Sequence, residues 1–404
     1  MTGALPLSRG EALRQALALA LGAAVSLGLA RFAYALLLGP MRADLGWSYF
    51  TAGAMNTGNA AGYLLGALGM PGAIARFGPR RALVGGGLAT AVLLALHGAV
   101  TSDAALAALR LLSGAASAAT FVAGGLMAAR LGSQAATVLS PGLVLGLYYG
   151  GTGLGIVVSA LLVPAVGDIA GAGLRPWQPA WLALGAVALA MTALMRSGTA
   201  ADTPPATAAA ASRAAVPWRR LGPALAGYFC FGLGYIGYMT FIVTLLREQG
   251  LAGPVVTVFY VTLGLGVVAS SWLWAGLLQR WRGGQAMALL NGLLALATVL
   301  PVASAHPVAV FASGALFGAV FLSVVASTTA LVRHNLPAAA WPGGITGFTI
   351  VFAVGQIAGP SAVGLIADGP GGLARGLAVS AGLLALGALL AAGQRALTVR
   401  ATER

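Results

Sequence analysis

Residues 28–46 read Gly-Leu-Ala-Arg-Phe-Ala-Tyr-Ala-Leu-Leu-Leu-Gly-Pro-Met-Arg-Ala-Asp-Leu-Gly. Arg31 falls inside the first long apolar segment, and a short charged turn closes that segment. The pattern returns 204 residues later, where Gly28 corresponds to Gly232, Leu29 to Leu233, Tyr34 to Tyr238, Asp44 to Glu248 and Gly46 to Gly250. Arg31 has no counterpart, because Tyr235 occupies its place. This repeat predicts that the chain arose by duplication. Arg31 is a charged position at which the two copies differ.

The composition indicates a protein whose solvent is the lipid bilayer. Of 404 residues, 59% are hydrophobic and 7% are charged, whereas soluble domains carry about 25% charged residues. The net charge of +14 comes from arginines scattered singly between apolar runs, a distribution that argues against a nucleic-acid partner. The single cysteine, Cys230, excludes an internal disulfide. No Cys/His cluster or nucleotide-binding loop is present in the sequence, so we expect no metal and no cofactor.

Apolar runs of membrane-spanning length predict a chain of transmembrane helices. The expected spans are 15–38, 49–72, 82–101, 104–128, 136–164, 177–195, 222–246, 253–278, 285–304, 308–332, 341–366 and 376–394. An even number places both termini on one side. With the termini in the cytoplasm, sixteen arginines are cytoplasmic and four are external, with Arg31 and Arg110 inside spans. This asymmetry predicts that orientation in a bacterial inner membrane. The first span is too long for a signal-peptide core, so we expect it to be retained.

The linker position and the repeat predict the architecture. Residues 196–220 form the longest segment outside the expected spans, and they divide residues 1–195 from residues 221–404. Six spans separate the copies, so both copies have the same orientation. We therefore predict an all-α polytopic membrane protein with twelve transmembrane helices in two parallel six-helix repeats, a plan typical of the major facilitator superfamily.

Local motifs strengthen the resemblance to that superfamily. Residues 72–81 resemble its cytoplasmic Gly…Asp-Arg-x-Gly-x-Arg-Arg signature, although Ala75 replaces the acid, and residues 276–283 form a weaker copy with Gln279 at that position. The resemblance implies a conformational latch, whose candidates are Gly72, Arg76, Gly78, Arg80, Arg81 and Arg280. An alternative is that these arginines only set the membrane orientation. Residues 28–48, 56–69 and 148–156 resemble the bacterial YbfB/YjiJ-type branch.

Two further motifs resemble those of proton-coupled exporters. Span four contains Arg110-Leu-Leu-Ser-Gly114, similar to an Arg-x-x-x-Gly motif. The glycines of residues 142–151 resemble an antiporter motif, except that Leu147 stands where a proline is usual. The alternative for these glycines is close helix packing.

Arg31 is the sharpest functional candidate. A buried arginine stays charged, so it needs a partner or water. On the expected span it lies about seven residues from the outer end, or roughly 10 Å of helix, so its side chain could also reach the membrane surface. One hypothesis is a structural ion pair, and the other is capture of an anionic substrate group. The candidate substrate-binding residues are Arg31, Tyr34, Asn56, Asn59, Tyr63, Arg110, Tyr149, Tyr235, Tyr238 and Gln356.

All eight acids fall in expected loops or tails. Proton coupling would then use Asp44, Glu248, His97 or the substrate's own carboxylate, although we expect His97 to lie at the membrane surface. We predict a monomeric secondary transporter, not an enzyme, whose partners are the lipid bilayer and a small organic anion. The alternative is a proton-coupled efflux antiporter for drugs or metabolites. A receptor or an intramembrane enzyme is disfavoured, because the sequence shows no soluble domain and no nucleophile–base pair.

Overall fold

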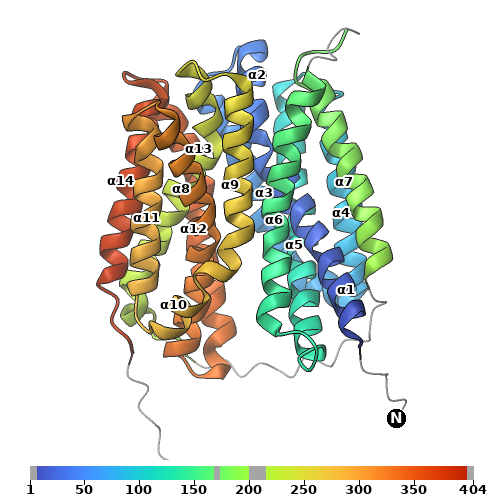
Figure 1. The fold of residues 1–404 in the computed structure, drawn as a ribbon, viewed down its shortest axis with the longest axis vertical. Helices are drawn as coiled ribbons and strands as arrows, with labels where there is room; N and C mark the ends of the chain where they lie inside the picture. The colour runs from blue at the N-terminus through green and yellow to red at the C-terminus, as the bar shows by residue number, and fades with distance from the viewer. Residues whose placement is uncertain (1–6, 168–172, 200–214, 398–404) are drawn as a thin grey trace, which may run out of the picture.

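A computed structural model describes residues 7–167, 173–199 and 215–397. Within these ranges the chain is helical and contains no strand (Figure 1). The predicted 196–220 linker falls largely on residues 200–214, which lie outside the described residues.

The first group of helices begins with one long helical segment in three parts. These are α1 (Arg9–Ala23), the π-helix η1 (Ala24–Phe32) and α2 (Tyr34–Leu45). Five helices follow, namely α3 (Tyr49–Phe77), α4 (Pro79–His97), α5 (Asp103–Gln134), α6 (Pro141–Gly167) and α7 (Gln178–Gly198).

The second group repeats this order. A short 3₁₀ turn, η2 (Trp218–Leu221), leads into α8 (Gly222–Glu248). The remaining elements are α9 (Gly253–Leu273), α10 (Ala275–Arg280), α11 (Gln285–Ala303), α12 (Pro307–Asn335), η3 (Ala338–Ala340), α13 (Trp341–Ala367) and α14 (Gly372–Ala392).

Eleven helical segments of the described chain are long and apolar enough to cross a membrane. The 29-residue α3 completes the predicted set of twelve. It is more polar than the others, because Asn56, Thr57 and Asn59 interrupt its apolar sequence. The all-helical prediction is therefore confirmed.

The predicted end of the first span was wrong. The helix continues past residue 38, through Pro40, and stops at Gly46, whose φ of 68° is left-handed. Hydropathy marks where the chain becomes polar, whereas a helix ends where its hydrogen bonding ends. Arg31 is thus fourteen residues from Leu45, or about 21 Å along a helix. The arginine cannot reach that end of the bundle, so it must be satisfied inside the protein.

The two groups of helices meet mainly along two seams, α3 with α13 and α6 with α9, and α2 also contacts α8. Backbones approach closely at both. A Cβ at Gly53 would lie 2.7 Å from the carbonyl carbon of Pro360, and one at Gly264 would lie 2.9 Å from the carbonyl oxygen of Gly153. The first helical segment and α8 are the most enclosed spans. In each, 89% of an 18-residue apolar stretch is buried inside the protein. Side chains on these two elements are therefore the ones held at the centre.

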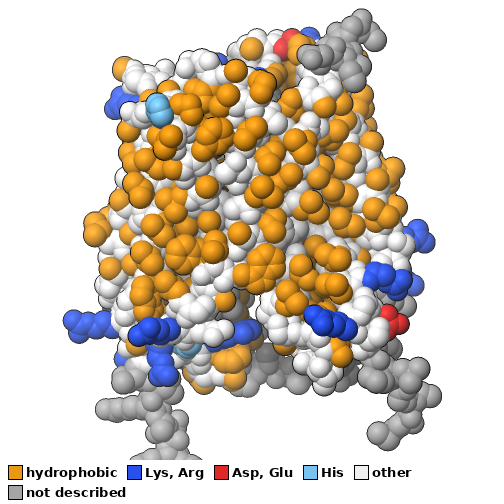
Figure 2. All heavy atoms as spheres, viewed as in Figure 1, with side chains coloured by type: hydrophobic (Ala, Val, Ile, Leu, Met, Phe, Trp, Pro, Cys, Tyr) orange, Lys and Arg blue, Asp and Glu red, His pale blue; other side chains and the backbone are white. Residues whose placement is uncertain are grey.

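The bundle has two distinguishable ends. In Figure 1, α1 begins and α14 ends at the lower end, and α2 ends at the upper end. Arginines on the face drawn in Figure 2 gather mainly toward the lower end, and a broad hydrophobic band lies above them. This distribution is the one expected of a membrane-embedded bundle.

Candidate functional site

The π-helix η1 positions Arg31 at the centre of the protein. Every residue from Ala24 to Phe32 is buried. π-helical turns are rare in proteins, and those that occur are often found at functional sites. Close packing fixes the segment, because a Cβ added at Gly155 of α6 would lie 2.8 Å from the Cα of Gly28.

Arg31 joins the two groups of helices. Its side chain is 4% exposed, and its Nη2 donates a 2.8 Å hydrogen bond to Oε1 of Gln356 on α13. The Tyr235 hydroxyl of α8 donates to the same oxygen at 3.1 Å. The guanidinium carbon lies 5.7 Å from the ring centroid of Tyr63 on α3. Four sequence-predicted residues are thus brought together.

The charge of Arg31 is not balanced by an acid in the described structure. Its buried Nε has no hydrogen-bond partner there. The ion pair found in the described part of the chain joins Asp44 to Arg175 and lies at the upper end of the bundle. A guanidinium held only by a neutral amide and aromatic rings can accept an anion through its remaining donors.

Arg110 on α5 is fully enclosed and engaged with neighbouring helices. Its Nη1 donates to the Ala30 carbonyl at 3.0 Å, and its Nη2 donates to Oδ1 of Asn56 at 3.0 Å. Its guanidinium carbon lies 4.5 Å from the ring centroid of Tyr34. The bond to Ala30 fixes the residue that precedes Arg31. This geometry favours a positioning role for Arg110.

The other polar candidates also contact protein groups. Asn56 donates a 2.7 Å bond to the Thr240 hydroxyl on α8, which links the two groups of helices. Tyr34 donates to the Ala52 carbonyl, and Asn59 donates to the Arg110 carbonyl. Tyr238 pairs with Ser313 within the second group. Asn59 alone among these four keeps a buried oxygen with no partner in the described structure.

Aromatic rings extend from the Arg31 site into both groups of helices. Tyr235 stacks on Phe231, with centroids 4.7 Å apart, and also packs on Phe352. Tyr149 is 40% exposed although its ring lies 6.0 Å from that of Phe121. The sequence does not predict Phe121, Phe231 or Phe352 as site residues, because a phenylalanine ring inside an apolar span carries no periodic signal of its own.

At the upper end, the side chain of Asp368, the residue that follows α13, contacts the first turn of α3. Its two carboxylate oxygens accept from the backbone N–H groups of Tyr49, at 2.7 Å, and Phe50, at 2.9 Å. The Tyr49 hydroxyl donates to Glu248 at the end of α8. A carboxylate at a helix N-terminus satisfies free donors and the helix dipole. We name Tyr49, Phe50, Glu248 and Asp368 the upper clasp. Sequence analysis missed it, since its partners are 199 to 319 residues apart.

The three proton-coupling candidates differ in their surroundings. Asp44 accepts hydrogen bonds from Arg175 and Trp177 within the first group, whereas Glu248 bonds across the groups. His97 is fully buried and stacks on Trp181, with centroids 4.5 Å apart. The α4–α7 packing encloses His97, and its expected depth at the membrane surface stays a prediction.

The latch candidates lie at the lower end. Gly78 takes a φ of 82° between α3 and α4, a turn that favours glycine. Arg80 donates to the Arg196 carbonyl at 2.9 Å, and the guanidinium carbon of Arg76 lies 5.4 Å from the Phe77 ring. Arg81 follows in the first turn of α4, Arg280 ends α10, and open space surrounds Gly72. A latching role remains a prediction.

Two of the antiporter-like glycines, Gly146 and Gly151, lie at close helix contacts. A Cβ at Gly146 would lie 3.2 Å from Nε1 of Trp272 on α9, and one at Gly151 would lie 2.9 Å from the Cα of Ala20 on α1. Close approach of small residues is the usual means by which membrane helices associate.

Comparisons with known proteins agree with this fold. The family model described as "Uncharacterised MFS-type transporter YbfB" matches residues 23–392. Two structures of the nucleoside transporter NupG are similar. One, of a mutant, has a TM-score of 0.73 and 13% identity, covering 94% of this chain and 99% of that one. The other has a TM-score of 0.70 and 14% identity, covering 95% and 98%.

A bacterial homologue of the human lysosomal transporter Spinster, solved in an inward-facing and unoccupied conformation, is also similar. It has a TM-score of 0.67 and 13% identity, covering 96% of this chain and 97% of that one. No curated protein matches the sequence. At these identities the structural likeness establishes the fold alone.

Proposed function

Because the chain belongs to the YbfB-type family of major facilitator superfamily transporters, we propose that it carries a small organic anion, such as a carboxylate, by alternating access. Arg31 is the anion-binding residue of this proposal. The observation that carries it is the buried Arg31 guanidinium, whose side-chain hydrogen bond goes to the neutral Gln356 amide.

Electrostatics supports an anionic substrate. Burial of an arginine inside a membrane span costs about 2.5–3.5 kcal/mol on insertion scales. A neutral amide offsets little of this cost, and Arg110 adds a second buried positive charge. An incoming carboxylate would supply the missing countercharge and could accept two parallel hydrogen bonds. A neutral substrate would leave the cost in place.

The same residues supply a route from binding to motion. Gln356 and Tyr235 belong to the second group and Arg31 to the first. A substrate carboxylate would compete with Gln356 for the guanidinium and so change a contact between the groups. In this proposal the upper clasp closes the external side, and the two groups rock about the Arg31 level. The protein acts in a bacterial inner membrane with both termini in the cytoplasm.

Uptake into proteoliposomes tests the proposal. Radiolabelled small carboxylic acids are presented beside uncharged compounds of similar size, such as their amides. We expect uptake of an acid by the wild type and no uptake by Arg31→Gln, with the amide left outside. Equal uptake of acid and amide would refute the anion assignment while leaving the transporter class intact.

Proton-coupled export is a second candidate, supported by the cross-group position of Glu248. A resistance assay in a pump-deficient host, with and without an uncoupler, separates it from anion transport. If expression of the protein raises drug resistance and the uncoupler abolishes that resistance, proton-coupled export is favoured. If expression of the protein does not change drug resistance, the first proposal is favoured.

A further inference from the structure

Three aromatic rings of the first group of helices meet beside Arg31. The Phe121 ring of α5 contacts the rings of Tyr63 on α3 and Tyr149 on α6, with centroids 6.4 and 6.0 Å apart. The guanidinium carbon of Arg31 is 5.7 Å from the Tyr63 centroid. Tyr63 and Phe121 are half-buried, and Tyr149 is exposed. We name these three aromatic residues the first wall, because each keeps surface that a ligand can contact.

The exposed side of Tyr149 faces the interior of the bundle and not the lipid. Leu154 and Leu161, which are exposed on α6, lie about 140° and 120° around the helix from Tyr149 at about 100° per residue. Ile156, on the same side of α6 as Tyr149, is fully buried, and its side chain would lie 3.1 Å from a Cβ at Gly264 in the second group. The first wall therefore borders the space between the two groups.

The second group supplies a wall of nearly parallel rings. Tyr235 of α8 stacks on Phe231, with centroids 4.7 Å apart and planes 18° apart, and on Phe352 of α13, at 5.5 Å and 21°. Phe352 also stacks on Tyr228, at 5.1 Å and 22°. Tyr228, Phe231 and Tyr235 are buried, whereas Phe352 is half-buried. We name these four residues the second wall. Its buried rings hold Phe352, whose remaining surface a ligand can contact.

Both walls reach the Arg31 charge. The Arg31 guanidinium lies near the Tyr63 ring of the first wall, and it shares the Gln356 amide oxygen with the Tyr235 hydroxyl of the second wall. The buried Nε of Arg31 has no hydrogen-bond partner in the described part of the chain. An anion that binds this guanidinium therefore has aromatic faces from both groups beside it.

We propose that the substrate is an aromatic carboxylate, an inference that rests on the anion-binding role of Arg31 proposed above. The carboxylate pairs with the guanidinium, and the ring of the substrate lies between Phe352 and the first wall. Aromatic pairs prefer offset-stacked or edge-to-face contacts with centroids about 4.5–7 Å apart. The rings of the two walls already have centroid spacings from 4.7 to 6.4 Å among themselves. A saturated ring of the same size gains burial here but no contact between π-systems.

Three pairs of acids test the inference on the purified protein in neutral detergent, with affinity read by calorimetry. The pairs are benzoate with cyclohexanecarboxylate, phenylacetate with cyclohexylacetate, and 3-phenylpropionate with 3-cyclohexylpropionate. Phe352→Leu and Tyr149→Leu each remove one ring from one wall and keep an apolar side chain. Phe259→Leu is the matched control, because Phe259 is a buried ring of α9 that packs on Gly314 of α12.

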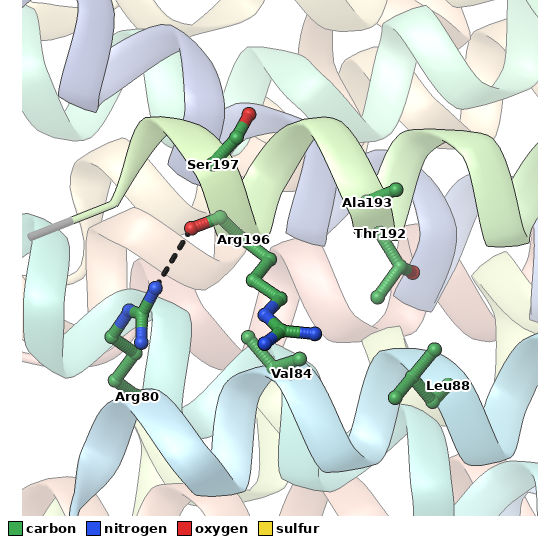
Figure 3. Close-up of a pocket in the computed structure, with 7 residues that line it drawn as sticks. All are labelled: Arg80, Val84, Leu88, Thr192, Ala193, Arg196 and Ser197. Carbon is green, nitrogen blue, oxygen red and sulfur yellow. Dashed lines mark hydrogen bonds between the residues drawn. The ribbon is translucent and has the colours of Figure 1, made fainter. Parts of the chain in front are cut away.

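A second control addresses another location for an acid. A pocket of about 470 Å³ lies between α4 and α7 (Figure 3). It is lined by Arg80, Val84, Leu88, Thr192, Ala193, Arg196 and Ser197, none of which is aromatic. Arg196→Gln should leave the affinity for every acid unchanged. A loss of binding in Arg196→Gln that equals the loss in Arg31→Gln would place the acid in that pocket and overturn the inference.

In at least one pair, we expect the wild type to bind the aromatic acid about fivefold more tightly than the saturated acid, the gain typical of one aromatic pair. This preference should fall in Phe352→Leu and in Tyr149→Leu and persist in Phe259→Leu, and Arg31→Gln should bind neither acid.

Equal affinities within every pair, with binding lost in Arg31→Gln, would overturn the aromatic assignment and leave the proposed anion transport intact. A preference that survives in both wall variants would also overturn the aromatic assignment alone. Undiminished binding of the acids in Arg31→Gln, or no binding of any acid by the wild type, would overturn both proposals.

Discussion

The Arg31 guanidinium donates a 2.8 Å hydrogen bond to the amide oxygen of Gln356, a residue 325 positions away on the opposite group of helices. Arg31 is a charged residue that has no charged counterpart in the second repeat. Its hydrogen bond therefore also links the two groups of helices. The arrangement makes the charge of residue 356 a direct probe of the site.

Gln356→Glu supplies Arg31 with a permanent internal countercharge. We expect a higher melting temperature in detergent, because a buried ion pair replaces a charge–amide contact. Binding of a carboxylate should weaken at least tenfold, since the substrate must displace a carboxylate instead of an amide. Gln356→Asn shortens the side chain without adding charge and serves as the control. Equal carboxylate affinity in the Glu and Asn variants would contradict the assignment.

Arg110 is expected to stabilise the fold, with little direct effect on the substrate. Arg110→Met removes the bonds to Ala30 and Asn56 and leaves buried acceptors unpaired. Each unpaired acceptor costs about 1–3 kcal/mol, so a large drop in melting temperature should follow. Arg31→Gln should change the melting temperature far less. A variant Arg110→Met that is as stable as the wild type would show that the bonds to α3 and η1 are dispensable.

The upper clasp is expected to hold one end of the bundle closed. Asp368→Ala removes both acceptors from the first turn of α3, and Tyr49→Phe removes the bond to Glu248. Hydrogen bonds to charged groups contribute about 1.5–3 kcal/mol each, so their loss should shift the population toward an open upper end.

Spin labels at Thr101→Cys and Gly369→Cys, in a Cys230→Ser background, report this opening as a longer interlabel distance. Arg375→Ala is the matched control, because its hydrogen bond to the Pro370 carbonyl joins the first turn of α14 to the loop just before it and does not cross between the groups. Distance distributions that coincide for the wild type and the Asp368→Ala, Tyr49→Phe double variant would show that the clasp does not govern closure.

The contact between η1 and α6 depends on two glycines. A methyl group at Gly155 would meet the Cα of Gly28 at 2.8 Å, and overpacking of this kind typically costs about 1–3 kcal/mol. We expect Gly155→Ala to lower the melting temperature and to reduce binding at Arg31. Gly142→Ala, where no atom lies within 4 Å, should leave both unchanged. Identical behaviour of the two variants would show that η1 tolerates displacement.

Much of the architecture could be predicted from the sequence, because apolar runs and arginine asymmetry report directly on membrane spans. The repeat also indicated Arg31 as a functional candidate, because Tyr235 occupies the corresponding position in the second copy. The end of the first helix was misplaced, since the hydrogen bonds that continue it to Leu45 leave no mark in hydropathy. The upper clasp and the pairing of Arg31 with Gln356 were out of reach, because they depend on how helices far apart in the sequence pack together.

The central claim is that Arg31 binds an anionic substrate group. The most direct measurement is thermal stabilisation of the purified protein by a panel of small organic acids, each paired with its uncharged amide. We expect at least one acid to raise the melting temperature of the wild type. Its amide should not do so, and Arg31→Gln should lose the response. An amide that matches its acid, an undiminished response in Arg31→Gln, or no response to any acid would contradict the claim.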